Sequence, residues 1–144
     1  MNSSTIEILY VEDSPGDVLL TRKALQQGQV FNHLNVVTNG EAAMEFLRNE
    51  SDFAGAPRPD LILLDLNLPR KSGREVLAEI RQDPTLETIP VVVITTSHAE
   101  ADILASYKLH ANCYVVKPVA LEEFLSVVKS ICEFWLRVVK LPKQ

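Results

Sequence analysis

The sequence has no long apolar run, only two cysteines, and no excess of basic residues. No stretch approaches the roughly 20 apolar residues of a membrane-spanning helix, and the polar start, residues 1–5, lacks the layout of a signal peptide. We therefore expect a cytoplasmic protein. The formal net charge of −5 gives no general attraction to nucleic acid or anionic membranes, and we interpret the small basic group of Arg70, Lys71 and Arg74 as solvated.

The two cysteines, Cys113 and Cys132, each lie in an apolar stretch and lack the spacing of a metal motif. This favours buried thiols in a reducing compartment, while a disulfide between them stays open at this point. The chain has 144 residues, of which 47% are hydrophobic. We expect a single domain over residues 1–144 with a sizeable core.

Short apolar runs alternate along the chain with longer amphipathic stretches, which predicts alternating strands and helices. The predicted strands are Ile6–Val11, 33–37, Leu61–Leu64, 89–95 and Cys113–Val116. The predicted helices are 15–28, Gly40–Leu47 after an Asn39 cap, Gly73–Gln82, 100–109 and about 120–139. This alternation predicts an α/β fold: a doubly wound, parallel five-stranded sheet with helices on both faces.

Polar side chains follow four of the predicted strands at the point where each strand ends. Glu12 and Asp13 follow the first strand, Asp65 the third and Lys117 the fifth, while Thr95 ends the fourth. Ligands of open α/β sheets bind outside the carboxyl ends of the strands. Each residue alone would be an ordinary solvated loop residue, but the set predicts one functional site.

The charges of this set predict its chemistry. Three carboxylates repel one another and Lys117 offsets only one of them, so a hard divalent cation with oxygen ligands, Mg²⁺, fits the site. A carboxylate beside such a cation can act as a nucleophile and form an acyl phosphate. Asp65 is the best nucleophile because it ends the most apolar strand. Thr95 and Lys117 are placed to bind phosphoryl oxygens.

These residues resemble the receiver domain of two-component response regulators, over about residues 6–128. The motifs that carry the resemblance are Glu12-Asp13, Asp65 in Leu-Leu-Asp-Leu-Asn-Leu-Pro, Thr95 in Val-Ile-Thr-Thr-Ser, and Lys117-Pro118. The resemblance implies a flavodoxin-like (βα)5 fold with strand order 2-1-3-4-5. It also implies a cis peptide bond between Lys117 and Pro118.

The resemblance assigns a role to each site residue. It implies Asp65 as the phosphoacceptor and implies Mg²⁺ bound by Asp13, Asp65 and the backbone carbonyl of Asn67, with Glu12 acting through water. It further implies that Thr95 and Tyr114 form a conformational switch. The protein would then be a phosphoacceptor signalling protein and not an enzyme in the ordinary sense.

A narrower resemblance lies in residues 67–70 with 73–77, 110–118 and 134–142, which are similar to the single-domain response regulators of cyanobacterial phytochromes. It implies a stand-alone regulator without an output domain, and a light-controlled sensor histidine kinase as its partner.

The last predicted helix carries more large apolar side chains than one packed stripe needs. We predict that it forms a homodimer interface together with the neighbouring edge strand. Alternatively, Phe134 and Trp135 fold back on their own domain. The predicted interface residues are Phe124, Val128, Ile131, Phe134, Trp135 and Val138.

Three other functions compete with a phosphorylated receiver. A haloacid-dehalogenase-type phosphatase would have a second aspartate where this chain has Asn67, and it would need a cap domain. A flavin carrier would not place Glu12 and Asp13 in its phosphate loop. An unphosphorylated adaptor would not need the intact residue set. We interpret His33, His98 and His110 as surface or structural residues.

Overall fold

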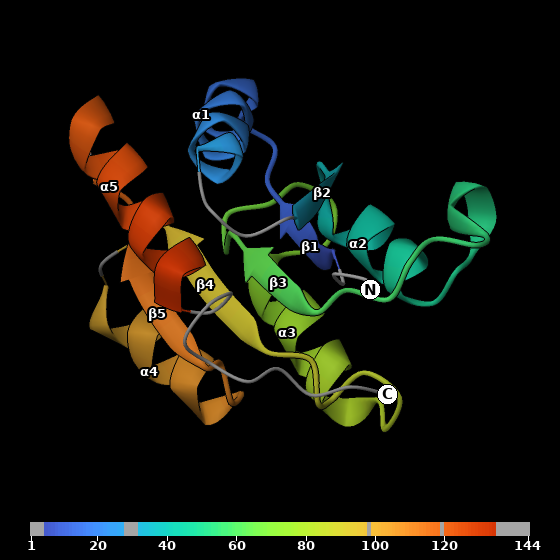
Figure 1. Cartoon of the computed structure of the whole chain (residues 1–144). Coiled ribbons are helices and arrows are strands. Elements are labelled where there is room, and N and C mark those ends of the chain that lie inside the picture. Colours follow the sequence, from blue (N-terminus) through green and yellow to red (C-terminus); the bar gives the residue numbers. More distant parts are fainter. Residues whose placement is uncertain (1–4, 28–31, 98, 119, 135–144) are drawn as a thin grey trace.

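The computed structural model describes residues 5–27, 32–97, 99–118 and 120–134, and in these residues strands and helices alternate along the chain (Figure 1). The strands are β1 Ile6–Val11, β2 Asn32–Val37, β3 Leu61–Leu64, β4 Val91–Thr95 and β5 Cys113–Val116. The α-helices are α1 Pro15–Gln26, α2 Gly40–Leu47, α3 Gly73–Gln82, α4 Glu100–Lys108 and α5 Leu121–Cys132, and a short 3-10 turn, η1, covers Ser51–Phe53.

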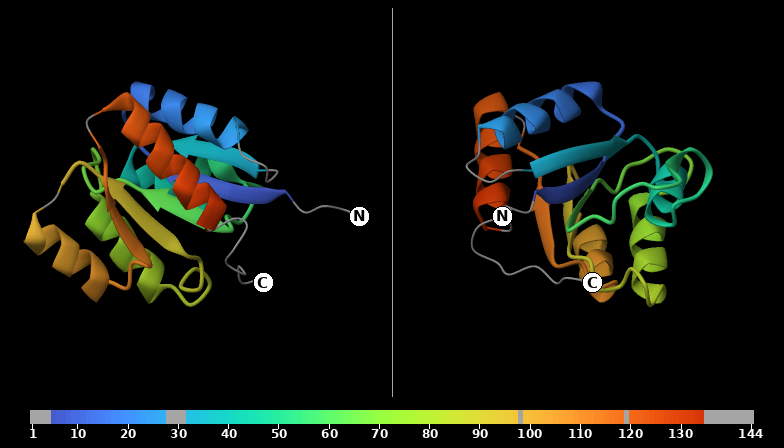
Figure 2. Two further views of the ribbon diagram at one scale, coloured as in Figure 1. Left: turned by 60° about the vertical axis from the view of Figure 1, so that its left-hand side comes forward. Right: turned by 45° about the vertical axis from the view of Figure 1, so that its right-hand side comes forward.

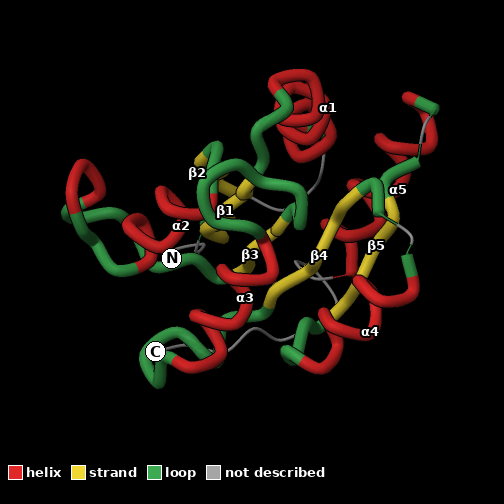
Figure 3. The backbone as a smooth tube through the Cα atoms, turned by 180° about the vertical axis from the view of Figure 1, so that it is seen from behind, coloured by secondary structure: helices red, strands yellow, loops and turns green. Residues whose placement is uncertain are grey.

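All strand pairs in the described sheet are parallel, in the order β2-β1-β3-β4-β5. The views from two further sides and from behind show α1 and α5 on one face of the sheet and α2, α3 and α4 on the other (Figures 2 and 3). This is the doubly wound, flavodoxin-like fold with the predicted strand order, and that prediction is confirmed.

The burial of β3 on both faces explains why its sequence is a continuous apolar run. Every residue of β3 is buried, because helices cover both faces of the sheet at its centre. Ile62 and Leu64 pack toward α2 and α3, whereas Leu61 and Leu63 pack toward α1 and α5. The sheet is therefore anchored from both sides directly before Asp65.

The strand and helix boundaries differ from the predictions at a few ends. The fourth strand begins at Val91 instead of residue 89, because Pro90 has no N–H to donate to the sheet. The first helix ends at Gln26. Asn39 caps α2 as predicted, since its side chain accepts a hydrogen bond of 2.7 Å from the Ala42 backbone N–H.

The last helix requires a correction to the predicted interface. Phe124, Val128 and Ile131 are buried against the domain's own sheet, in the cluster that also contains β1 and β4 residues. They are core residues and are unavailable to a partner. Phe134 is 52% exposed. Trp135 and Val138 lie outside the described residues, as does the predicted continuation of the helix toward residue 139.

Within the described residues, no helix combines the length and apolarity that a bilayer crossing requires. Cys113 on β5 is a free, half-buried thiol, and burial raises the pKa of this thiol.

Candidate functional site

The carboxyl ends of the neighbouring strands β1 and β3 bring the predicted acidic residues together. Asp65 directly follows β3, and its backbone N–H donates to the Val11 carbonyl at the end of β1, at 3.1 Å. Glu12, Asp13 and Asp65 each offer an oxygen atom, and these three atoms lie within 4.8 Å of one another. Glu12 and Asp65 are buried, while Asp13 is exposed to solvent. This cluster has the hard oxygen donors that a divalent cation prefers.

Lys117 enters the same site from the end of β5. Its backbone N–H donates to the Thr95 carbonyl at 2.7 Å, which continues the β4–β5 pairing to the site. Its ammonium donates to Glu12, to Asp65 Oδ2 at 3.0 Å and to Asp17 Oδ2 at 2.8 Å. The side chain of Lys117 is only 4% exposed.

The pKa of Lys117 reflects two opposing effects. Burial lowers this pKa, but hydrogen bonds to Asp17, Glu12 and Asp65 outweigh the burial and raise the pKa above its ordinary value. The ammonium therefore stays charged and partly neutralises the carboxylates around it.

Glu12 is the most deeply buried carboxylate of the site, with 1% of its side chain exposed. It accepts hydrogen bonds from the Tyr10 hydroxyl at 3.2 Å and from the Ser14 backbone N–H at 3.1 Å. Burial raises the pKa of Glu12 to about 7, and the negative Asp65 acts in the same direction, while Lys117 opposes both. Lys117 therefore favours the ionised form of Glu12, against the burial that favours the protonated form.

Thr95 and Tyr114, the predicted switch pair, both contact Ser97. Thr95 is fully buried, and its hydroxyl oxygen accepts a hydrogen bond of 3.5 Å from the Ser97 backbone N–H. The Tyr114 hydroxyl donates to the Ser97 carbonyl at 2.9 Å. Asn67 joins this group, because its side-chain amide donates to Thr95 Oγ1 at 3.4 Å. Ser97 therefore connects the site to the strand that carries Tyr114.

One sequence prediction about the site is wrong, and one residue of the site is not predicted. The Lys117–Pro118 peptide bond is trans, in contrast to the expected cis bond. Sequence reasoning also missed Asp17, the third carboxylate on Lys117. In the sequence Asp17 looks like an ordinary acidic residue in the first turn of a helix, which is favourable there in any protein.

Gly73 packs closely against the backbone of Asp65 and Leu66. A Cβ atom at residue 73 would lie 2.3 Å from the Asp65 carbonyl oxygen and 2.6 Å from the Leu66 Cα atom. Both are backbone atoms that cannot rotate away. The absence of a side chain at Gly73 therefore lets α3 begin directly against the site.

We expect Gly73→Ala to lower the free energy of unfolding by about 2–3 kcal/mol, because the methyl group displaces the backbone of Asp65. Gly16→Ala is the matched control, since a Cβ there has a single neighbour, Ser14 Oγ at 4.0 Å. Urea denaturation measures both variants. Equal stability of the two would contradict the close packing described here.

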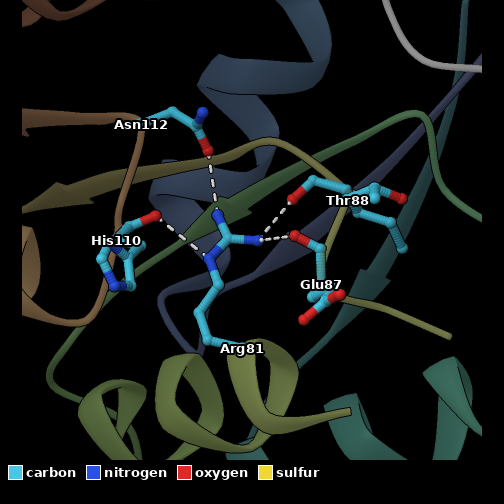
Figure 4. A pocket seen from close by; sticks show the side chains of 6 residues that line it. Arg81, Glu87, Thr88, His110 and Asn112 are labelled. Atoms are coloured by element: carbon cyan, nitrogen blue, oxygen red, sulfur yellow. Dashed lines mark hydrogen bonds between the residues drawn. The ribbon is translucent and has the colours of Figure 1, made fainter. Parts of the chain in front are cut away.

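A hollow separate from the acidic cluster lies around Arg81, between the end of α3 and the loops before β4 and β5 (Figure 4). It has a volume of about 410 Å³. The Arg81 guanidinium donates to the carbonyls of His110, Glu87 and Ile89 and to the Asn112 side chain, at 2.7–3.0 Å. These hydrogen bonds hold α3 against the loops, so the role of Arg81 in this hollow is structural.

The histidines lie apart from the acidic cluster where the structure describes them. His33, on edge strand β2, forms a hydrogen bond of 3.0 Å with Glu7, and the carbonyl of His110 accepts from Arg81. His98 lies outside the described residues.

The comparisons with known proteins agree with this geometry. The family model of the response regulator receiver domain matches residues 8–129 of this chain. The chain is 51% identical over 135 residues to response regulator Rcp1 of Synechocystis sp., covering 94% of this chain and 92% of that protein.

Two solved structures have nearly the same fold. The Mn²⁺-bound form of Rcp1 aligns with a TM-score of 0.94 and 50% identity, over 96% of this chain and 99% of that one. The phosphorylated cyanobacterial phytochrome response regulator RcpA aligns with a TM-score of 0.95 and 51% identity, over 97% of this chain and 100% of that one. This chain therefore belongs to the response regulator receiver domain family.

Proposed function

We propose that this protein is a phosphorelay response regulator that accepts a phosphoryl group on Asp65. The observation that carries the proposal is the position of Asp65: it is buried at the end of the central strand, beside two further carboxylates and in contact with Lys117. A carboxylate held in this way presents one face to an incoming phosphoryl group, while the ammonium stabilises the charge on the phosphoryl oxygens.

Mg²⁺ fits the acidic cluster. Asp13, Asp65 and the backbone carbonyl of Asn67 are its proposed ligands, with Glu12 acting through water. Asp13 is the exposed member of the cluster, which suits a cation that keeps several waters. When bound, Mg²⁺ supplies positive charge that screens the attacking carboxylate and draws in the phosphoryl group.

Each remaining residue of the site has a separate task. Lys117 binds a phosphoryl oxygen and keeps its proton throughout the transfer. Thr95 turns its hydroxyl toward another phosphoryl oxygen, and this movement shifts the oxygen that accepts hydrogen bonds from Asn67 and Ser97. Because Tyr114 is bonded to the Ser97 carbonyl, this movement disturbs the position of Tyr114. The proposed signal therefore leaves through β5 and the neighbouring helix α4.

The proposed phosphodonor is a sensor histidine kinase of the phytochrome type. This proposal is supported by the 51% identity to RcpA, a cyanobacterial phytochrome response regulator. The phosphoacceptor role proposed for Asp65 does not depend on that choice of kinase.

We further propose a homodimer that uses the surface of α5 and edge strand β5. Its support is three exposed apolar side chains: Val116 at the end of β5, Leu121 at the start of α5 and Phe134 after its end. Sedimentation should show a dimer in at least one phosphorylation state, and monomers at high concentration in both states would refute it.

Incubation with acetyl phosphate tests the proposed function. We expect one phosphoryl group per chain in the presence of Mg²⁺, and none after the divalent cation is removed with a chelator. Intact-protein mass spectrometry measures the incorporation. No incorporation with Mg²⁺ would favour the unphosphorylated adaptor, whereas continuous hydrolysis of phosphomonoesters would favour the phosphatase.

A further inference from the structure

Lys117 has a third partner that the proposed transfer does not explain. Asp17 lies in the first turn of α1, 100 residues before Lys117 in the chain, and its Oδ2 atom is 2.8 Å from the Lys117 ammonium. An ammonium has three N–H groups, and here Glu12, Asp17 and Asp65 each accept one of them. No hydrogen of Lys117 is left for a phosphoryl oxygen in this arrangement.

The position of Asp17 in its helix does not require this contact. Its backbone N–H donates to the Ser14 hydroxyl at 3.3 Å, which completes the helix cap without its side chain. Glu12 and Asp65 already place two negative charges on Lys117. The Asp17 carboxylate therefore adds negative charge to a site that has to receive an anion, which opposes the transfer.

The three carboxylates differ in how easily they can release Lys117. Glu12 is 1% exposed, so losing Lys117 would leave a buried negative charge without an opposite charge beside it. Asp65 is 7% exposed and is the proposed nucleophile. Asp17 is 28% exposed, so water can replace the ammonium at its oxygen. Breaking the contact between Lys117 and Asp17 therefore costs less free energy than breaking either of the other two.

We propose that Asp17 is a positioning residue that holds Lys117 in the resting state and gives up this hydrogen bond to the incoming phosphoryl group. This inference rests on the proposed phosphorylation of Asp65. In the transfer the bond from phosphorus to the donor breaks, an oxygen–phosphorus bond in acetyl phosphate or a nitrogen–phosphorus bond in a phosphohistidine. A bond from an Asp65 carboxylate oxygen to phosphorus forms, and the donor leaves with the electron pair. Lys117 exchanges Asp17 for a phosphoryl oxygen without losing a proton, so Asp17 slows phosphorylation.

The test is the rate of phosphoryl incorporation from acetyl phosphate at saturating Mg²⁺. We expect Asp17→Asn to raise this rate about two- to five-fold, which is the size expected for the loss of a partly exposed ion pair. Asp17→Glu keeps the carboxylate and should stay near the wild-type rate. Glu41→Gln, a change of the same charge in the first turn of α2, is the control for net charge and should have no effect.

A second comparison separates positioning from general electrostatics. In a Lys117→Met background, Asp17→Asn should leave the residual rate unchanged, because Asp17 acts through Lys117. Urea denaturation confirms that each variant is folded. An unchanged or lower phosphorylation rate for Asp17→Asn would overturn this inference, and so would the same increase in the Lys117→Met background. The proposed function stands separately if the wild type takes up a phosphoryl group and Asp65→Asn does not. Unlabelled wild type would overturn both.

Discussion

Asp65→Asn is expected to abolish phosphoryl incorporation from acetyl phosphate while the protein stays folded. The amide that replaces the carboxylate has nearly the same shape. Its oxygen can still accept a hydrogen bond from Lys117, whose ammonium lies 3.0 Å from Asp65 Oδ2 in the wild type. It is not a nucleophile toward phosphorus, so no acyl phosphate forms. Phosphoryl incorporation, measured by intact mass, should fall below detection in this variant.

The same substitution should not destabilise the protein. It removes one of the carboxylates that crowd a buried site, and with it the like-charge effect of Asp65 on Glu12. We expect the free energy of unfolding without Mg²⁺ to stay unchanged or to rise by about 1 kcal/mol. Asp52→Asn, in the exposed turn η1, is the control for charge and should be labelled like the wild type. Equal labelling of Asp65→Asn and wild type would refute the assignment.

Lys117→Met is expected to produce the largest loss of stability among the site variants. The methionine fills a similar volume but leaves buried Glu12 and Asp65 facing each other without a positive charge. Removing one partner of a buried ion pair costs about 3–5 kcal/mol. The phosphorylation rate should also fall on the order of a hundred-fold, because a donor to the phosphoryl oxygens is lost.

This loss of stability should depend on pH. The pKa of Glu12 is raised to about 7 in the folded protein and is raised further without Lys117, whereas the unfolded chain has an ordinary glutamate pKa. The folded variant therefore binds the proton more tightly, and its stability is greatest at low pH and falls as pH rises through the folded pKa. Urea denaturation should show a larger deficit at pH 8 than at pH 5.5, and Mg²⁺ at pH 8 should partly restore it.

Lys108→Met, at the exposed end of α4, provides the matched control and should change stability by less than about 0.5 kcal/mol. Equal effects of the two lysine substitutions would contradict the central position of Lys117 in this site.

Much of the fold follows from patterns that are local in sequence. Leu61–Leu64 has the same bounds in the sequence prediction and in the structure, because a fully apolar run followed by an aspartate admits few other structures. The positions of Glu12, Asp65, Thr95 and Lys117 followed from the topology alone, since parallel strands end at the same edge of the sheet.

Other features depend on contacts that only the folded chain creates. Asp17 reaches Lys117 across 100 residues of sequence, and a first-turn acid gives no local sign of such a partner. In the last helix, periodicity identifies an apolar stripe but not its partner. The stripe predicts an interface at Phe124, Val128 and Ile131, whereas these residues pack on the domain's own sheet. The packing of Gly73 on the Asp65 carbonyl likewise appears only in three dimensions.

The central claim, that Asp65 is the phosphoacceptor, is tested most directly by locating the phosphoryl group in the wild-type chain. Borohydride reduction converts an aspartyl phosphate to homoserine, which peptide mass spectrometry identifies by position. After incubation with acetyl phosphate and Mg²⁺, we expect this conversion at Asp65 and at no other residue. Conversion at Asp13, or a phosphorylated chain with unmodified Asp65, would contradict the account.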